Sequence, residues 1–231
     1  MYVVSNANGI ICGCSFSFGF ASIGDSFRKI KSYSEFLSEK SDFNHQNISL
    51  IGGSNYSIAK QIEWAVLQNP GFIVFNTTTT NRHEYVRDFN QLSDITINNF
   101  DYIINESPTV FPTSNQIRSI SIRRIIQKST GNNDYKKILD YHVNYTCDSI
   151  KKDYDRMYIL YAISLIAKKN IPYICIDLAG LMNLETSDNI INIHYTDMTR
   201  NYPLKDDPMH FNEDGHLYIS DQILSRLHTS L

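Results

Sequence analysis

Short, largely apolar runs that end at turn-forming residues are the feature that most constrains the fold of this 231-residue chain. They lie at residues 10–12, 48–51, 72–75 and 171–176. Such runs are typical of strands that are buried on both faces of a parallel sheet. Segments with apolar residues at helical spacing separate them, at 32–39, 57–68 and within 135–169. This alternation predicts an α/β fold, a three-layer α/β/α sandwich around a central parallel sheet.

The length of the chain is ordinary for one α/β domain with a single core, so we predict one domain over residues 1–231. Pro, Ser and Asn interrupt the apolar stretches of residues 88–133, which we predict to be an insertion that forms a lid or wall over the site. The last helix is expected to begin near Asn212, a good N-cap, and to run toward the C-terminus.

Composition and charge argue against several partners. Lys and Arg number 21 and Asp and Glu 24, a net charge of -3 that does not favour nucleic acid or an anionic membrane. No apolar run approaches the roughly 18 to 20 residues of a membrane span, and no basic residue precedes the N-terminal apolar run. We therefore expect a soluble, cytoplasmic protein without a cleaved signal. The four Cys residues form no CxxC pair, so we expect free thiols and no metal site.

Residues 13–19, Gly-Cys-Ser-Phe-Ser-Phe-Gly, directly follow the first predicted strand. The carboxyl ends of the strands are where parallel α/β sheets carry their chemistry. The sequence therefore predicts that the Ser15 hydroxyl lies on a tight turn at this edge of the sheet.

An acid and a base stand three residues apart near the other end of the chain, as Asp207 and His210. A Ser hydroxyl is a poor nucleophile at neutral pH, and it needs a His that takes its proton and a carboxylate that orients that His. Ser15, His210 and Asp207 supply these three groups. His216 lies on the predicted last helix, and we expect it to be a packed or capping residue instead.

These motifs resemble the short sequence blocks of the SGNH (GDSL-type) hydrolases, a family of serine esterases. Residues 207–216 are similar to the family's Asp-x-x-His-Pro-Asn-x-x-Gly-His, with Phe211 in place of Pro. The first block of the family is Gly-Asp-Ser, which occurs literally at residues 24–26. Ser15 is nevertheless preferred over Ser26, because only Ser15 follows a strand-like run and precedes the family's Ser-x-Gly tail. The resemblance implies a flavodoxin-like fold and Ser15 as the nucleophile.

The resemblance also implies an oxyanion hole built from three donors. The N–H of Ser15 is one, and Gly52, after the second predicted strand, matches the family's second block. The third block, usually Gly-x-Asn-Asp, is replaced by residues 75–84, which look more like a variant of some phage-type members. Thr78 or Asn76 could donate there, and Asn81 remains a third choice.

Three further residues are possible substrate-binding residues, namely Asn55, Arg82 and Glu84. For Arg82 and Glu84 the alternative is a mutual ion pair without a role in binding.

The resemblance implies hydrolysis of short acyl, acetyl-type esters, with small molecules or carbohydrates as the bearers of the ester and with no cofactor. One alternative is an O-acyltransferase that uses the same three residues. The other is a catalytically silent binding module on the same fold, suggested by Cys14 in place of Asp and by the altered third block. Neither oligomeric state nor the natural substrate follows from the sequence.

Overall fold

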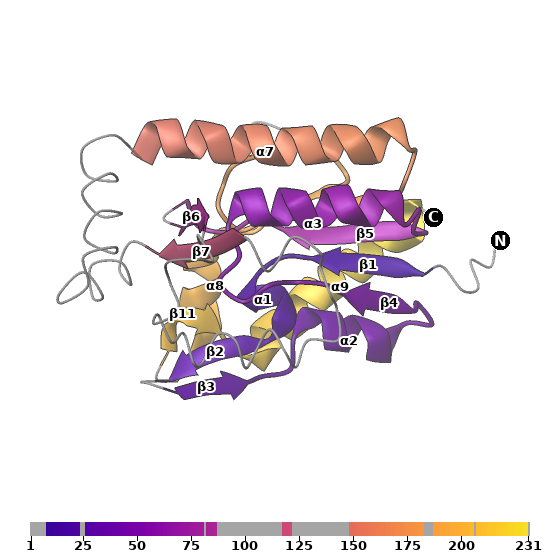
Figure 1. The fold of residues 1–231 in the computed structure, drawn as a ribbon. Coiled ribbons are helices and arrows are strands. Elements are labelled where there is room, and N and C mark those ends of the chain that lie inside the picture. The colour runs from indigo at the N-terminus through magenta and orange to yellow at the C-terminus, as the bar shows by residue number, and fades with distance from the viewer. Residues whose placement is uncertain are drawn as a thin grey trace.

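A five-stranded parallel sheet forms the centre of the protein (Figure 1). The computed structural model describes residues 8–23, 26–80, 82–86, 117–121, 148–182, 187–205 and 207–230. The strand order is β4-β1-β5-β8-β9. The strands are β1 (Gly9–Cys12), β4 (His45–Asn47), β5 (Phe72–Asn76), β8 (Tyr173–Asp177) and β9 (Ile190–Asn192). This is the flavodoxin-like order. The second strand of this sheet, β4, lies on one side of β1 and all its later strands lie on the other side, so a switch point forms between β1 and β5.

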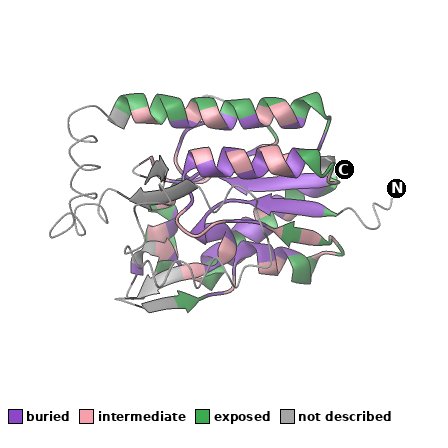
Figure 2. Ribbon diagram, viewed as in Figure 1, coloured by how far each residue is buried: buried purple, intermediate pink, exposed green. Residues whose placement is uncertain are grey.

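Helices cover both faces of this sheet. The helices α3 (Asn55–Leu67) and α7 (Asp148–Lys168) pack on one face, and α2 (Tyr33–Lys40) and α9 (Glu213–Ser230) pack on the other (Figure 1). The central strands β1 and β5 are buried along their whole length, whereas the edge strand β4 is partly exposed (Figure 2). Successive residues alternate between the two layers, so that Ile73 packs in the core beside α3 and Val74 in the core beside α2 and α9. The predicted three-layer α/β/α sandwich is confirmed.

Local signals in the sequence explain where the helices begin. The side chain of Ser32 accepts a hydrogen bond from the Glu35 N–H, and Glu35 binds back to the Ser32 N–H, which forms a capping box at α2. Ser54 caps α3. Asn212 Oδ1 accepts from the Gly215 N–H at 3.2 Å at the start of α9, as the sequence predicts.

The predicted strand at residues 48–51 is wrong, because the strand in this region is β4, three residues earlier. Ile48 and Leu50 still donate backbone hydrogen bonds to the carbonyls of Ile11 and Gly13, at 2.9 and 3.0 Å. The chain is nevertheless already leaving the sheet there, toward a turn in which Gly52 has a φ of 76°. A left-handed φ of this kind favours glycine.

Among the elements that the sequence did not predict are the edge strand β9 and the short helix α8 (Tyr195–Asn201). The remaining elements are short: α1 (Ser15–Phe18), β2 (Phe20–Ile23), β3 (Ser26–Lys29), β6 (Arg82–Val86), β7 (Ile117–Ser121), β10 (Pro203–Leu204) and β11 (Asp207–Phe211). Strands β6 and β7 form an antiparallel pair, and β7 is the one described part of the predicted insertion. The rest of residues 88–133 lies outside the described residues, so the lid stays a prediction.

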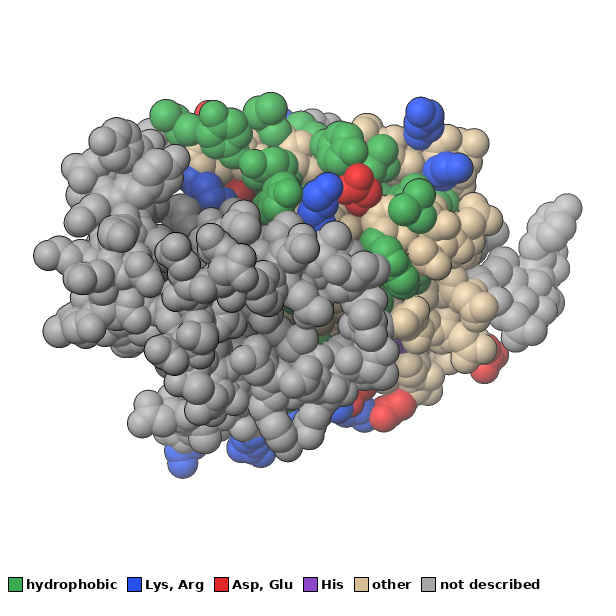
Figure 3. All heavy atoms as spheres, viewed as in Figure 1, with side chains coloured by type: hydrophobic (Ala, Val, Ile, Leu, Met, Phe, Trp, Pro, Cys, Tyr) green, Lys and Arg blue, Asp and Glu red, His purple; other side chains and the backbone are tan. Residues whose placement is uncertain are grey.

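Apolar side chains gather on the outer surface of α7 (Figure 3), and others lie on its buried side. Ile150, Tyr154, Met157 and Tyr161 are exposed, whereas Ile159 and Ile166 are buried against the sheet layer. Apolar residues on both sides weaken the helical periodicity that the sequence displays. No helix in the described ranges is long and apolar enough to cross a membrane.

Candidate active site

The nucleophile candidate lies on the turn that links β1 to α1. After Cys12 the chain passes Gly13 and Cys14, and α1 begins at Ser15. A Cβ atom at Gly13 would lie 2.0 Å from Ser17 Oγ and 2.3 Å from Asn76 Oδ1, so no larger residue fits there. Glycine at this position allows the turn to pack closely against the end of β5.

Ser15, His210 and Asp207 form one hydrogen-bonded chain. Ser15 Oγ lies 3.0 Å from His210 Nε2, and His210 Nδ1 lies 2.8 Å from Asp207 Oδ2. Since a carboxylate only accepts hydrogen bonds, Nδ1 carries the proton and donates a hydrogen bond to Asp207, and Nε2 is then free to accept a hydrogen bond from the Ser15 hydroxyl. Ser15 is 4% exposed, and the side chains of His210 and Asp207 are 12% and 2% exposed. This geometry is suited to a serine nucleophile whose base is oriented by a carboxylate.

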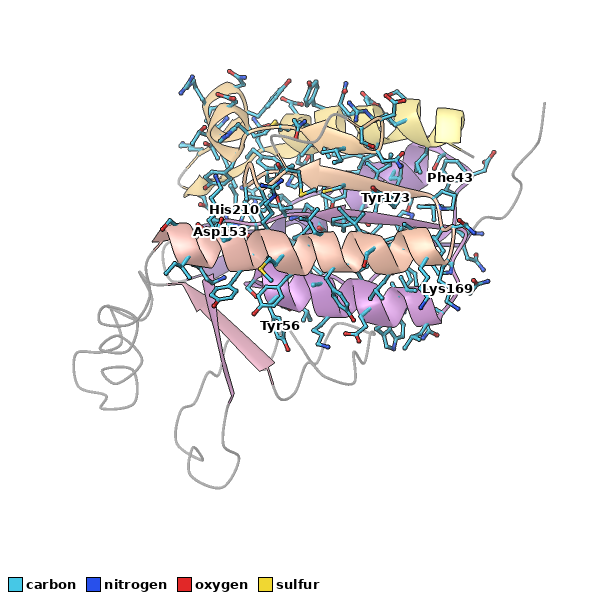
Figure 4. The ribbon with its side chains drawn as sticks, turned by 90° about the horizontal axis from the view of Figure 1, so that it is seen from above. Phe43, Tyr56, Asp153, Lys169, Tyr173 and His210 are labelled. Atoms are coloured by element: carbon cyan, nitrogen blue, oxygen red, sulfur yellow. The ribbon has the colours of Figure 1, made fainter. Side chains whose placement is uncertain are left out.

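Aromatic packing holds the His210 ring in place. The Phe16 ring stacks on Phe211 with a centroid distance of 5.3 Å and an interplanar angle of 6°, and it lies 5.1 Å from the His210 ring. Because Phe16 follows Ser15 directly and Phe211 follows His210 directly, this stack holds the Ser15 and His210 side chains close together. Seen along the view of Figure 4, His210 lies toward the end of the molecule where α7 begins, and Lys169 and Tyr173 lie toward the other end.

Ser26 occupies a different place. It begins β3, where it pairs with Ile23 in the antiparallel hairpin of β2 and β3. The predicted preference for Ser15 rests on a strand that ends just before the serine, and β1 is that strand. The His210 ring is hydrogen-bonded to Ser15.

Two of the predicted oxyanion donors are backbone N–H groups, those of Ser15 and Gly52. Neither has a hydrogen-bond partner within the part of the chain that the structure describes. The hydrogen bond from Leu50 N–H to Gly13 O, at 3.0 Å, brings the turn that contains Gly52 beside the turn that contains Ser15. Unpaired donors beside a nucleophile are suited to the negative charge of a tetrahedral intermediate.

Thr78 is the third donor candidate. Its side chain is fully buried, and its Oγ1 has no hydrogen-bond partner among the described residues. A buried hydroxyl without a partner costs free energy, so it calls for an explanation. A role as an oxyanion donor is such an explanation.

Asn76, the other side-chain candidate, is occupied by hydrogen bonds. Its Oδ1 accepts from the Ser17 hydroxyl and lies 3.2 Å from the Tyr33 hydroxyl, and its Nδ2 donates to Cys14 Sγ at 3.4 Å and to Thr77 O at 2.9 Å. Burial raises the pKa of Tyr33, which keeps this hydroxyl a donor. These contacts favour a structural role for Asn76. Thr78 is then the better candidate for the third donor.

Asn55 is also engaged inside the protein. Its side chain binds both backbone groups of Thr78 and the buried carboxylate of Asp155. These contacts favour a positioning role over the predicted substrate contact. Arg82 and Glu84 lie in β6, but their side chains are not described, and Asn81 lies outside the described residues. Their roles therefore stay predictions.

His216 is buried on α9, where its Nδ1 accepts from the Tyr33 N–H at 3.3 Å and its ring lies 4.5 Å from the Phe211 ring. Burial, with a smaller effect from His210, lowers the pKa of His216 to about 3. The residue is therefore neutral and packed, as expected from the sequence.

Three of the four cysteines are described, and all three are buried free thiols, namely Cys12, Cys14 and Cys175. Burial raises the pKa of the Cys12 and Cys175 thiols. Cys147 lies outside the described residues. Within the described ranges, His, Cys, Asp and Glu side chains nowhere gather in a group of three that could hold a metal ion.

Sequence reasoning missed two residues beside this site, Gln61 and Asp155. Gln61 Oε1 accepts from the Gly13 N–H at 2.8 Å, and Gln61 Nε2 donates to Gly13 O at 3.0 Å. A signal was present, since Gln61 stands beside Ile58 and Ile62 in the buried stripe of α3, where an unpaired amide is costly.

The comparison with solved structures finds the same fold over almost the whole of this chain. The esterase EstA from Pseudoalteromonas sp., in a structure inhibited by monoethylphosphonate, is 9% identical with a TM-score of 0.51, covering 96% of this chain and 97% of its own. The lipase Lip_vut3 from a goat rumen metagenome is 11% identical with a TM-score of 0.51, covering 95% and 97%. A GDSL-like lipase from Bacteroides thetaiotaomicron is 10% identical with a TM-score of 0.50, covering 97% and 89%.

The sequence itself matches no family model and no curated protein. At identities of 9 to 11%, the likeness to the solved structures concerns the arrangement of the backbone. The protein has the fold of the GDSL-type esterases and lipases.

Proposed function

We propose that the protein is a serine esterase that hydrolyses short acyl esters. The observation that carries the proposal is the hydrogen-bonded chain from Ser15 Oγ through His210 to Asp207, with distances of 3.0 and 2.8 Å. Its members come from positions 15, 207 and 210, and the fold brings them together at the carboxyl end of β1. An intact chain of this kind favours an enzyme over a silent binding module.

The proposed reaction is acyl transfer in two steps. His210 Nε2 takes the Ser15 proton as Ser15 Oγ attacks the ester carbonyl, and the alcohol leaves with the proton that His210 returns. Water then attacks the acyl-enzyme with His210 again as base, and the carboxylic acid is released. Asp207 holds the imidazole in the required tautomer and stabilises the imidazolium.

The proposed oxyanion hole consists of the N–H groups of Ser15 and Gly52 and the hydroxyl of Thr78. Each of them lacks a hydrogen-bond partner among the described residues. Donors that are already in place when the charge develops act without any cost of reorganisation. This arrangement needs no metal or organic cofactor.

Acetyl-type esters are the proposed substrate class, with small molecules or carbohydrates as the bearers, as the resemblance to the SGNH hydrolases implies. An acyltransferase would use the same residues with a sugar hydroxyl in place of water. Release of free acid from an acetylated sugar in plain buffer supports the hydrolase, whereas transfer to added sugar without release of acid supports the acyltransferase.

The test measures turnover of p-nitrophenyl acetate and labelling by a fluorophosphonate probe. The wild-type chain and Ser26→Ala should both turn over the ester and accept the label. Ser15→Ala should do neither, with little change in the free energy of unfolding. An inactive, unlabelled wild type would refute the proposal, and loss of activity in Ser26→Ala alone would move the nucleophile to Ser26.

A further inference from the structure

Helix α3 carries two buried carboxamides, each of which binds both backbone groups of a single residue on a neighbouring loop. Asn55 Oδ1 accepts from the Thr78 N–H, and Asn55 Nδ2 donates to Thr78 O, both at 2.8 Å. Gln61 makes the same pair of bonds to Gly13, at 2.8 and 3.0 Å. Neither side chain is exposed to solvent.

The two residues held in this way lie in the two loops that build the proposed site. Gly13 stands two positions before Ser15, at the end of β1. Thr78 carries the unpaired hydroxyl and follows β5. Strands β1 and β5 are adjacent, with Cys12 opposite Phe75. The sheet therefore brings the two loops together, and side chains of α3 form hydrogen bonds to the backbone of both loops.

We propose that Asn55 and Gln61 are positioning residues of the esterase site: Gln61 fixes the Ser15 turn, and Asn55 fixes the Thr78 loop so that its hydroxyl reaches the oxyanion. The inference rests on the proposed function. The two residues act through other groups and do not touch the substrate.

Asp155 of α7 supports Asn55 in this role. Asp155 Oδ2 accepts from Asn55 Nδ2 at 3.0 Å, and Asp155 Oδ1 is paired with Lys151 on the same helix. The carboxylate is fully buried, and the side chain of Lys151 is largely buried. Because a carboxylate only accepts, the Nδ2 of Asn55 must point toward Asp155, which leaves Oδ1 for the Thr78 N–H. The orientation of the Asn55 amide is thereby fixed.

The energetics agree with a positioning role. An amide in an apolar helix face costs free energy unless all its groups are paired, and an apolar side chain would pack there without that requirement. What the pairing adds is a defined geometry for the loop, and catalysis is sensitive to displacements of about 1 Å. The carboxamides therefore contribute most to the placement of Ser15 and Thr78.

The first experiment is a double-mutant cycle with p-nitrophenyl acetate. Asn55→Leu should lower kcat by roughly 30-fold to 300-fold with KM changed less than about threefold, since a displaced oxyanion donor affects mainly the transition state. In a Thr78→Val background the same change should cost less than about threefold, because no hydroxyl is left to position. Gln61→Met should lower kcat by the same factor in both backgrounds, because it acts through Ser15.

Two further variants serve this cycle. Asn55→Asp keeps the size of the side chain but places a carboxylate oxygen against the Asp155 carboxylate and Thr78 O, so at neutral pH it should lower kcat at least as much as Asn55→Leu does. Ile166→Ala removes a buried side chain from α7 and should lower stability without changing kcat. Equal losses for Asn55→Leu with and without the Thr78 hydroxyl would overturn the proposal, as would full activity of Asn55→Leu or Thr78→Val.

The second experiment does not depend on esterase activity. Amide hydrogen exchange at Thr78 should accelerate at least about tenfold in Asn55→Leu and stay unchanged in Gln61→Met, and exchange at Gly13 should show the reverse. Failure of the proposed function appears as an inactive and unlabelled wild type, and the exchange pattern then decides whether the two residues hold the loops. Failure of this inference appears as an active wild type with additive losses or unselective exchange.

Discussion

Thr78→Val should lower turnover while leaving the protein as stable as before or more stable. Valine has nearly the shape of threonine, so the change removes one hydroxyl and little else. That hydroxyl is buried and has no partner within the described part of the chain. The N–H and the carbonyl of Thr78 stay hydrogen-bonded to the Asn55 side chain, so the loop should not move.

The substitution should therefore act in opposite directions on stability and on turnover. A buried polar group without a hydrogen bond costs about 1–3 kcal/mol, so its removal should leave the free energy of unfolding unchanged or raise it by about that amount. Loss of one oxyanion donor lowers kcat by a factor of about 10²–10³, which corresponds to about 2.7–4 kcal/mol of transition-state stabilisation. Substrate binding in the ground state should change little.

The assay combines kcat and KM for p-nitrophenyl acetate with urea unfolding of the same samples. Ser220→Ala is the matched control, since Ser220 on α9 also has a buried hydroxyl without a partner in the described ranges. This control should match Thr78→Val in gaining or keeping stability, but it should retain full turnover. Unchanged kcat in Thr78→Val would show that the oxyanion is held without this hydroxyl. A marked loss of stability would show that the hydroxyl has a partner in solution.

Three further outcomes are expected from the same structure. His210→Ala should lower kcat/KM by several orders of magnitude and Asp207→Asn by somewhat less, and near-normal steady-state rates in His210→Ala would exclude it as the base. Gly13→Ala should lower both kcat and the urea midpoint, because its Cβ would lie 2.0 Å from Ser17 Oγ; an unaltered urea midpoint would contradict the close packing. Because the pKa of His216 is lowered to about 3, the unfolded chain binds a proton there below pH 6.5 that the folded chain does not. Stability should therefore fall with decreasing pH by up to about 1.4 kcal/mol per unit from this group, and urea titrations at pH 7, 6 and 5 should show a shallower fall in His216→Gln, whereas parallel curves would show that His216 is protonated when folded.

The sequence predicted the layers of the fold and the three residues of the hydrogen-bonded chain, because each depends on local patterns. Asp207 and His210 are three residues apart on β11, and Ser15 follows a strand directly, so short-range signals were enough to single them out. The sheet order then follows from general rules of α/β packing. These are features that one short segment can specify.

The remaining details of the site depend on contacts between distant segments. Thr78 and Asn76 were equal candidates in the sequence. They differ in the structure because Asn76 is hydrogen-bonded to Ser17 and Cys14, whereas the Thr78 hydroxyl has no partner among the described residues. Asn55 meets Asp155 across 100 residues of sequence, and no local pattern reports that contact. The strand predicted at residues 48–51 was misplaced for a related reason, because Ile48 and Leu50 still bond to Ile11 and Gly13, and no local pattern shows where the chain leaves the sheet.

The altered third block and the two carboxamides of α3 are connected by geometry. The amide nitrogen of an asparagine side chain reaches one bond further from the backbone than the hydroxyl of a threonine. In the proposed oxyanion hole Thr78 takes the place of the usual asparagine, so the position of its hydroxyl depends more strongly on where the loop backbone lies. The bonds from Asn55 to both backbone groups of Thr78 supply that placement, and Asp155 fixes the amide that makes them. On this reasoning, Asn55 compensates for the shorter donor, and a Thr78→Asn variant should depend less on Asn55 than the natural chain does.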